Sequence, residues 1–540
     1  MSEQFSFNLI NEKWIPCIRA DDGQVVTLSL RETLAESHTL YDIAGDTPLQ
    51  TAALYRLLIA ILLRVYRPAA DDFSIWREMW HNPTWDMGRI NAYLDEWRHR
   101  FDLFAAERPF YQSDSDDSRV RPKPITSLKY GNGFLHNPLF DHDNEERGEA
   151  VTAAEVARNL ITVQAFGLGG GHKGMFSDAP WSKGIVFFVQ GDNLKDTLFL
   201  NLLPYPDLER SFIISDESDD APVWEQANPW AMKDGIPLGY LDYLTWQNRR
   251  ILLFPEQQKG QIVVSRWQVG GGVSLAADIS DPLKSYRKHE KEGMLVYQFD
   301  ESRGLWPNSY ALFAPTRLRN DRFSIPPATF THLKLLISDV KLLEPYAVYR
   351  CKALGQGKDQ AKVDYLREER FPFPLRYLVD EALRNQLQDA LLLCDSAAFH
   401  LRGALRRVGF YLYLAKPDEI SWRSAGINPK VPKMLSDLAR ADIDNWVRHT
   451  EADIYFWSAL DVPFQDFIVR LAEQDSDDTV NWWREQVRMA ATGAFAKAKE
   501  YAHESDRAHR AVIEGQGYLN YQLNQMLGKE VKNEQRDRFY

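Results

Sequence analysis

A glycine-rich segment with an adjacent cation occupies residues 164–174, with the sequence QAFGLGGGHKG. Glycine has no Cβ, so its backbone can approach a phosphate or the wall of a groove more closely than other residues can. The candidate binding residues of this loop are Gly169, Gly170, Gly171 and Lys173. The segment suggests anion or nucleic-acid binding, and a loop that only turns the chain is the alternative.

Two nucleotide-binding motifs resemble this loop but fail in context. Gly169, Gly171 and Gly174 satisfy the G-x-G-x-x-G spacing, which binds a dinucleotide only between a preceding strand and a following helix. Here the order is inverted, because residues 153–166 have helical periodicity and residues 184–190 read as a strand. A Walker loop fails because Lys173 is followed by glycine instead of serine or threonine. No nucleotide cofactor is therefore expected.

A second candidate for chemistry is the triplet Asp141, His142 and Asp143. A metal-dependent nuclease would use such side chains, but it needs at least three convergent ligands, and no other compact cluster of histidine and aspartate accompanies the triplet. A polar surface loop is the alternative. The sequence has no G-x-S-x-G elbow and no cysteine nucleophile motif. A binding module without a metal is therefore favoured over an enzyme.

The net charge limits how the chain can contact nucleic acid. At a formal charge of −12, any such contact must be local, because Lys and Arg side chains drive it. One basic cluster has i, i+3, i+4, i+7 spacing and is predicted to line one face of a helix, as a candidate for a local nucleic-acid contact. Its members are Lys284, Arg287, Lys288 and Lys291. A solvated helix is the alternative, because Glu290 and Glu292 dilute the cluster.

The elements that must position these residues divide the chain into two parts. A length of 540 residues exceeds one hydrophobic core, so two or three domains are expected. The first part mixes strand-like alternation at residues 5–15, 24–30 and 184–190 with helical periodicity at residues 49–66, 153–166 and 193–203. We predict one mixed α/β domain over residues 1–370, which carries the loop and the basic cluster.

The second part is predicted to be helical. Two prolines in the sequence FPFP at residues 371–374 disfavour a helix before them and favour an extended connection. Apolar residues then recur every three or four positions over residues 375–414, 433–474, 479–503 and 506–527. This pattern predicts a four-helix bundle over residues 375–540. The predicted fold class is α+β, with a large mixed α/β N-terminal domain followed by a C-terminal four-helix bundle.

The cysteines and the apolar runs indicate the compartment. Cys17, Cys351 and Cys394 are scattered and odd in number, which excludes a disulfide framework and suits a reducing cytoplasm. The N-terminus lacks a signal-peptide pattern, and the longest apolar run, residues 57–63, is too short to span a bilayer. A cytoplasmic protein without a membrane partner is predicted.

Several segments in order resemble the CasA family, the large subunit of the type I-E CRISPR surveillance complex Cascade. The early segments are FNLI at 7–10, WIP at 14–16, LSLRETL at 28–34, LFDH at 139–142 and QAFGLGGG at 164–171. The later segments are GYLDYLTWQ at 239–247, DP at 281–282, LW at 305–306 and REERFP at 367–372. No single motif is decisive, but the resemblance covers nearly the whole chain.

This resemblance implies a non-catalytic subunit that recognises a short protospacer-adjacent motif (PAM) in double-stranded DNA through the minor groove. The subunit would wedge the duplex open to start R-loop formation and serve as the platform for a helicase-nuclease. The implied partners are the target DNA, the 5′ handle of the CRISPR guide RNA, and the backbone, handle-binding and small subunits of Cascade. No cofactor and no metal are implied.

The resemblance also implies roles for particular residues. The glycine loop that enters the PAM minor groove matches Gly169, Gly170 and Gly171. The loop that contacts the guide handle and the first target region matches Leu139, Phe140, Asp141 and His142. The wedge hairpin that parts the strands matches Lys358, Asp359, Gln360 and Ala361, with Gln360 at its tip. Arg287 and Lys288 fall where the family has basic residues along the DNA path.

Two features of the family are missing from the sequence. The family's lysine finger falls near Trp267, so Arg266 or Lys259 is the expected substitute. Some members also carry a cysteine-rich insertion before the Asp-Pro segment, which this chain lacks.

Overall fold

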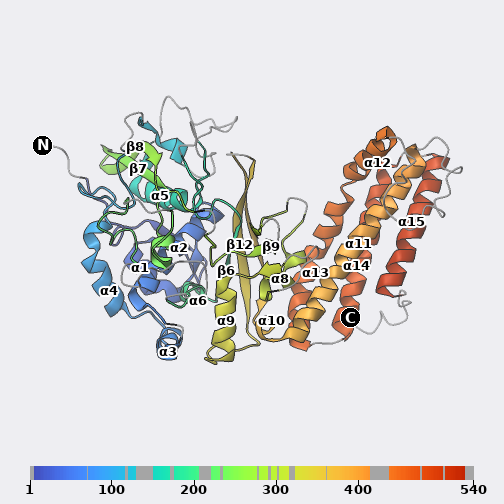
Figure 1. Cartoon of the computed structure of the whole chain (residues 1–540), viewed down its shortest axis with the longest axis horizontal. Coiled ribbons are helices and arrows are strands. Elements are labelled where there is room, and N and C mark those ends of the chain that lie inside the picture. Colours follow the sequence, from blue (N-terminus) through green and yellow to red (C-terminus); the bar gives the residue numbers. More distant parts are fainter. Residues whose placement is uncertain are drawn as a thin grey trace. The chain divides into compact units, whose positions relative to one another are not determined.

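The computed structural model describes residues 5–69, 71–115, 120–128, 150–170, 176–205, 220–230, 235–276, 279–289, 293–300, 303–315, 323–359, 362–413, 437–474, 477–502 and 505–528. The chain forms two compact units (Figure 1). Unit 1 comprises Met1–Phe299 and Ala314–Val379, and unit 2 comprises Asp300–Phe313 and Asp380–Tyr540. A short middle segment thus belongs with the C-terminal helices.

Unit 1 mixes helices and strands, as the sequence predicts. Its α-helices are α1 (Leu30–Glu36), α2 (Pro48–Tyr66), α3 (Phe73–His81), α4 (Met87–Glu96), α5 (Ala153–Phe166), α6 (Leu194–Leu200), α7 (Tyr240–Leu244), α9 (Ala328–Ser338) and α10 (Arg376–Val379). Its strands are β1 (Ile15–Arg19), β2 (Val25–Leu28), β3 (Leu40–Ile43), β4 (Lys123–Pro124), β5 (Val151–Thr152), β6 (Ile185–Gln190), β7 (Arg249–Gln258), β8 (Gln261–Gly271), β9 (Tyr286–His289), β10 (Gly293–Val296), β11 (Phe323–Ile325), β12 (Val348–Asp359) and β13 (Lys362–Pro374).

Helix α2 is the central helix of unit 1. Thr47 caps its N-terminus by accepting a hydrogen bond from the Gln50 N–H, and Pro48 at the first position has the backbone φ that a helix needs. The helix is long and apolar enough to cross a bilayer, but 89% of its most apolar window is buried inside the protein. Its apolar residues therefore form the core of unit 1.

The strands of unit 1 pair in small antiparallel sheets. Their orders are β2-β1-β3, β10-β9-β11, β13-β12-β6 and β4-β8-β5, with β7 also paired to β8. Strands β7 and β8 join through Lys259 and Gly260, which both have positive φ, as a type I′ hairpin turn requires. Strand β13 lies at a sheet edge and includes Pro372 and Pro374, which an edge strand tolerates because it need not donate on its outer side.

Two local predictions are wrong. Residues 5–15 were predicted as a strand, but the first strand begins only at Ile15. The chain turns first because the Asn8 side chain accepts from the Ile10 N–H and the Asn8 carbonyl accepts from the Asn11 and Glu12 N–H groups.

The second wrong prediction is the helix that would carry the basic cluster. Residues Tyr286–His289 form strand β9, which pairs with β10 on one side and β11 on the other. The spacing of the charges fits a helix, but hydrogen bonds to two neighbouring strands decide the local structure. Arg287 and Lys288 are neighbours on a strand, so their side chains point to opposite faces.

Unit 2 contains α8 (Tyr310–Phe313), α11 (Glu381–Tyr413), α12 (Asp437–His449), α13 (Ala452–Gln474), α14 (Asp477–Ala498) and α15 (Asp506–Leu527). The last five form the C-terminal helical bundle, which agrees with the predicted fold class (Figure 1). The segment 433–474, predicted as one helix, is interrupted between α12 and α13, where Glu451 has a φ of 50°. Trp483 is fully buried in the bundle, stacks on Phe467 at 4.6 Å and donates to the Ala390 carbonyl.

Candidate nucleic-acid interface

The glycine loop leaves the C-terminus of α5 and is closed by a backbone pair. Gly170 and Phe176 each donate a backbone hydrogen bond to the other's carbonyl at 3.0 Å. Gly170 has a φ of 139°, a conformation that side chains rarely allow, so glycine is required there. The Gly169 N–H donates to the Asp178 carboxylate at 2.7 Å. Gly171 and Lys173 lie outside the described residues.

A buried arginine lies directly beneath this loop. Arg249, at the start of β7, is fully buried, and its guanidinium donates to the Leu168 carbonyl at 2.6 Å. It also lies over the Phe176 ring at 5.6 Å. A Cβ on Gly167 would come within 2.6 Å of the guanidinium carbon, so the loop can pass over Arg249 only with glycine at this position. The loop therefore has a positive charge at its base.

The predicted wedge residues lie at the end of a long antiparallel hairpin. Strands β12 and β13 pair from Val348 with Pro374 to Asp359 with Lys362. Strand β6 pairs with β12 only as far as Gly355, so beyond that point the recorded pairing is between β12 and β13 alone. Lys358 and Asp359 belong to the end of β12, and Gln360 and Ala361, which connect the strands, lie outside the described residues.

One buried glutamine joins the hairpin to the base of the glycine loop. The Gln356 Nε2 group donates to the Phe166 carbonyl at 3.0 Å and to the Ser182 carbonyl at 2.9 Å. Phe166 is the last residue of α5 before the loop, and Ser182 follows the loop. A single side chain of β12 is therefore bonded to both ends of the loop segment. The structure brings together the roots of two segments that lie far apart in the sequence.

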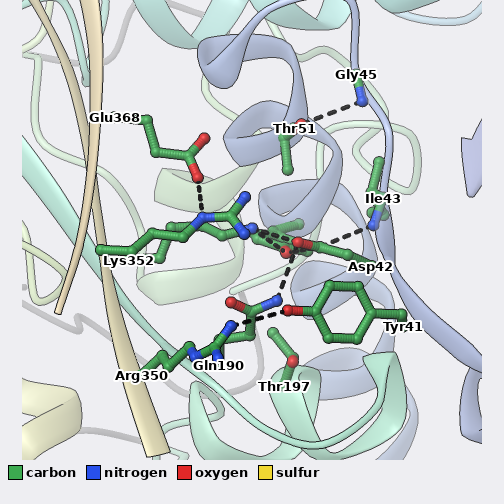
Figure 2. A network of polar contacts seen from close by, with 12 residues as sticks. Tyr41, Asp42, Ile43, Gly45, Thr51, Gln190, Thr197, Arg350, Lys352 and Glu368 are labelled. Carbon is green, nitrogen blue, oxygen red and sulfur yellow. Dashed lines mark hydrogen bonds and ion pairs between the residues drawn. The ribbon is translucent and has the colours of Figure 1, made fainter. Parts of the chain in front are cut away.

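A buried polar network holds the base of the hairpin (Figure 2). Lys352 on β12 forms an ion pair with Asp42 on β3, and their side chains are only 1% and 3% exposed. The Lys352 ammonium also donates to the Tyr55 hydroxyl at 3.1 Å. Asp42 accepts further bonds from the Tyr55 hydroxyl and from Gln190 of β6. The network links β3, α2, β6 and β12, so the hairpin base is fixed to the core of unit 1.

Burial dominates the electrostatics of this network. Tyr55 is fully enclosed, and its burial, together with the Asp42 carboxylate, raises the pKa of its hydroxyl well above the usual value. Tyr55 therefore stays a neutral donor to Asp42 at physiological pH. The buried Asp42 carboxylate thus accepts from the neutral Tyr55 hydroxyl and pairs with the Lys352 cation, so its hydrogen-bonding groups are satisfied.

The remaining predicted basic residues are not gathered on one surface. Lys284 is only 5% exposed, and its ammonium donates to the Pro180 and Lys183 carbonyls at 2.7 Å each. Burial lowers the pKa of Lys284 to about 8, and the residue is not available to DNA phosphates. Arg287 lies over the Tyr297 ring at 4.4 Å, and Lys288 is exposed. The predicted four-residue stripe is thus wrong, and Lys291 lies outside the described residues.

The segment considered for the missing lysine finger lies on the β7–β8 hairpin. Trp267 is fully buried, and its indole N–H donates to the Pro124 carbonyl and the Ser127 hydroxyl, so it has a core role. Arg266 is exposed on β8, and Lys259 occupies the turn. That Arg266 or Lys259 replaces the family's lysine finger stays a prediction.

The predicted guide-handle loop cannot be compared with the structure. Leu139, Phe140, Asp141 and His142 lie outside the described residues, as does Asp143 of the alternative nuclease triplet. Within the described ranges, no group of three histidine, cysteine or carboxylate side chains could hold a metal ion.

Sequence reasoning missed Arg249, Gln356 and Asp178, which hold the loop and the hairpin root. Arg249 and Arg250 read as an ordinary basic pair, and Gln356 stands between two glycines of a strand. The glycines were the only local signal. A Cβ on Gly357 would come within 2.2 Å of the Tyr365 ring on the paired strand, which shows how closely the backbone packs there.

Comparison with known proteins gives consistent matches over the whole chain. Residues 8–494 match the model of the family described as CRISPR-associated protein Cse1. A CRISPR-associated protein CasA/Cse1 from Thermus thermophilus is 30% identical over 541 aligned residues, covering 97% of this chain and 99% of the relative.

Solved structures give the same picture. The crystal structure of CasA from Thermus thermophilus matches with a TM-score of 0.75 and 26% identity, covering 96% of this chain and 100% of that chain. Cse1 from Acidimicrobium ferrooxidans matches with a TM-score of 0.75 and 24% identity, covering 97% and 99%. A chain of a CRISPR RNA-guided surveillance complex matches with a TM-score of 0.70 and 19% identity, covering 95% and 99%. The last two show the fold alone.

Proposed function

The chain belongs to the Cse1 family of CRISPR-associated proteins, and we propose that it is the PAM-reading large subunit of a type I-E Cascade. In this role it recognises the PAM in duplex DNA with the glycine loop and opens the duplex with the β12–β13 hairpin. Its partners are the guide RNA with its 5′ handle, the other Cascade subunits, and a helicase-nuclease recruited after R-loop formation. It acts without a cofactor and without catalysis of its own, in the cytoplasm.

The glycine loop has the properties that a minor-groove reader needs. The minor groove of B-DNA is about 6 Å wide and displays a degenerate pattern, so a backbone without side chains fits and readout tolerates several motifs. Position 170 requires glycine, because its backbone φ is 139°. The buried guanidinium of Arg249 holds the base of the loop by donating to the Leu168 carbonyl, so the loop backbone is presented in one conformation.

A wedge must stay in place while it parts stacked bases, and unstacking costs a few kcal/mol per base step. The Lys352 network fixes the hairpin base to the core, so force on the tip does not displace the root. In RNA-guided systems, each later DNA base pair is replaced by an RNA–DNA base pair of about equal stability, so only the first opening step needs the wedge.

The observation that carries the proposal is the bonding of Gln356 to both ends of the glycine loop. Through this residue, the PAM reader and the wedge share one rigid root. A duplex held by the loop is therefore presented to the hairpin at a fixed register, as opening directly beside the PAM requires.

The test is strand opening by the reconstituted complex with Gln360→Ala. We expect slower opening of a fully paired target and a much smaller defect on a target whose first base pairs are mismatched, because the second substrate is already open. Gln257→Ala, an exposed glutamine on β7, is the matched control and should behave as wild type. Equal defects on both substrates would reject the wedge and leave a simple contact.

A further inference from the structure

A cavity lies within unit 1, on segments to which neither the glycine loop nor the wedge hairpin belongs. Its cavity volume is about 420 Å³, within the roughly 300–1,000 Å³ range of small-molecule sites. Residues of the segments 100–114 and 223–230 form most of the lining, together with Gln247 and Leu252. The cavity has charged, aromatic and amide groups on its walls, which together define the ligand that fits it.

Two arginines give the cavity a positive wall. Arg100 and Arg108 line it, and in the described part of the chain no carboxylate forms an ion pair with either. The Arg108 guanidinium donates to the Gln226 carbonyl, and the buried Nε of Arg100 has no hydrogen-bond partner among the residues that the structure describes. Burial, and then the charge of Arg100, lower the pKa of Arg108, so two like charges are held close together. Such a pair is stabilised by an anion.

The lining carboxylate, Asp114, does not neutralise this pair. Its oxygen accepts from the Ser115 N–H at 2.7 Å and from the Gln268 side chain. These neutral donors belong to the segment that follows Asp114 and to β8. The positive charge of the two arginines therefore stays available to a ligand.

Aromatic side chains also line the cavity. Trp224 stacks near Phe110 and Tyr111, with ring centroids 6.2 and 6.3 Å apart, and its indole N–H donates to the Tyr93 hydroxyl at 2.7 Å. Trp230 lies under the Arg250 guanidinium at 5.0 Å. Trp224 is only 4% exposed, so the neighbouring rings cover it, whereas Trp230 is half-buried and offers a surface on which a flat ring can stack.

One amide in the lining has no hydrogen-bond partner in the described part of the chain. Gln247 is only 7% exposed, and its side chain forms no hydrogen bond with any described residue. Gln112, also in the lining, differs because its amide donates to the Leu103 carbonyl and accepts from the Leu253 N–H. The donor and the acceptor of the Gln247 amide are therefore both available to a ligand in the cavity.

The backbone of the lining is held in an unusual conformation. Arg108 and Tyr111, on either side of Pro109 and Phe110, both have a φ of 55°. Residues other than glycine adopt this conformation rarely, and such positions concentrate at ligand sites. The strain orients Arg108 and Tyr111 in the wall of the cavity.

We propose that this cavity binds one nucleotide. Its phosphate lies against Arg100 and Arg108, its base stacks on Trp230, and the Gln247 amide hydrogen-bonds the base edge. The nucleotide is either free or one residue of a nucleic-acid strand. The proposal does not depend on the function proposed above, because it concerns the isolated chain and uses neither the glycine loop nor the hairpin.

The first test is calorimetric titration of the purified full-length chain with AMP, CMP, GMP and UMP at low salt. Inorganic phosphate and adenosine serve as half-ligand probes. We expect at least one nucleotide to bind more tightly than either half, and Arg100→Gln/Arg108→Gln to weaken it about ten-fold or more. Arg98→Gln is the matched control, since Arg98 is exposed in the same helical turn but does not line the cavity. Equal binding by the double variant, or no saturable binding together with no crosslink from the oligonucleotide of the next test, would overturn the proposal.

A second test needs no variant. The wild-type chain is photo-crosslinked to 4-thio-UMP or to an oligonucleotide with one 4-thiouridine, and the modified peptides are mapped. Crosslinks within residues 100–114 or 223–230 from the mononucleotide identify a free nucleotide as ligand, and crosslinks from the oligonucleotide alone identify a strand. Crosslinks from neither probe in these segments contradict the proposal.

Discussion

Replacing Lys352 by methionine tests the network that fixes the wedge hairpin. The substitution keeps the length of the side chain but removes its charge, while Asp42 stays 3% exposed. The carboxylate would keep neutral donors, namely the Tyr55 hydroxyl, the Gln190 amide at 3.1 Å and the Ile43 N–H at 2.8 Å. It would lose the only cation that the network supplies directly to it in the described structure.

The expected cost follows from that geometry. Removing one partner of a buried ion pair costs about 3–5 kcal/mol, because the remaining charge stays buried. Because three neutral donors remain on the Asp42 carboxylate, the cost should lie at the lower end of this range, and we expect a loss of about 3 kcal/mol of local stability. The assay is native-state hydrogen exchange of the β12 amides in the full chain, which avoids assuming that the two units unfold together. Exchange should be roughly 100-fold faster, since about 1.4 kcal/mol is a factor of ten.

Two further variants decide the interpretation. Lys334→Met removes an exposed lysine on α9 and should change exchange by less than about two-fold, because isolated surface substitutions cost little. Asp42→Asn/Lys352→Met removes both charges and should recover about 1 kcal/mol or more relative to Lys352→Met. If Lys352→Met leaves β12 exchange within about three-fold of wild type, the ion pair does not hold the hairpin base and the reasoning fails.

Three other predictions follow from buried or exposed polar groups. Gln356→Leu leaves the Phe166 and Ser182 carbonyls without their donor, so we expect it to cost about 2–3 kcal/mol of stability. Hydrogen exchange at the Phe176 amide should become faster. Unchanged exchange there would contradict the link between the glycine loop and the hairpin. Burial lowers the pKa of His332 to about 3, so the unfolded chain binds a proton that the folded chain does not, and stability falls as pH drops below 6.5, by about 2 kcal/mol at pH 5. His332→Phe should lose less stability than wild type between pH 7 and pH 5 in denaturant titrations, and parallel losses would contradict this cause. Lys288→Ala should reduce the slope of log affinity for DNA against log salt concentration by about 0.9. Arg287→Ala should reduce it by less, because the two side chains face opposite sides of β9. Equal slopes for both variants and wild type would mean that neither side chain contacts a phosphate.

Local patterns predicted the elements whose structure depends on local interactions. The helix at residues 153–166 was predicted with the bounds that α5 has, because its apolar periodicity and Thr152 cap act within a few residues. The bundle of unit 2 was predicted for the same reason. The interruption at Glu451 was not, because the sequence there has neither glycine nor proline to mark it.

Non-local interactions explain the errors. Charge spacing alone predicted a helix for the basic cluster, whereas pairing with β10 and β11 makes residues 286–289 a strand. Lys284 is buried separately, where its ammonium donates to the Pro180 and Lys183 carbonyls. The glycine loop was found from its composition, but the residues that hold it were not. Arg249 and Gln356 are buried by contacts more than 80 residues away along the chain, and no local pattern reports such burial.

The most direct test of the account is the affinity of the reconstituted complex, with guide RNA and the other subunits, across a library of PAM sequences. We predict that wild type binds a subset of PAMs tightly and that Gly170→Asp loses this binding, through its backbone φ and through repulsion from phosphate. Gly23→Asp is the matched control, because Gly23 also has a positive φ but lies in open space. Equal affinity for PAM and non-PAM duplexes, or full binding by Gly170→Asp, would contradict the proposed role of the glycine loop.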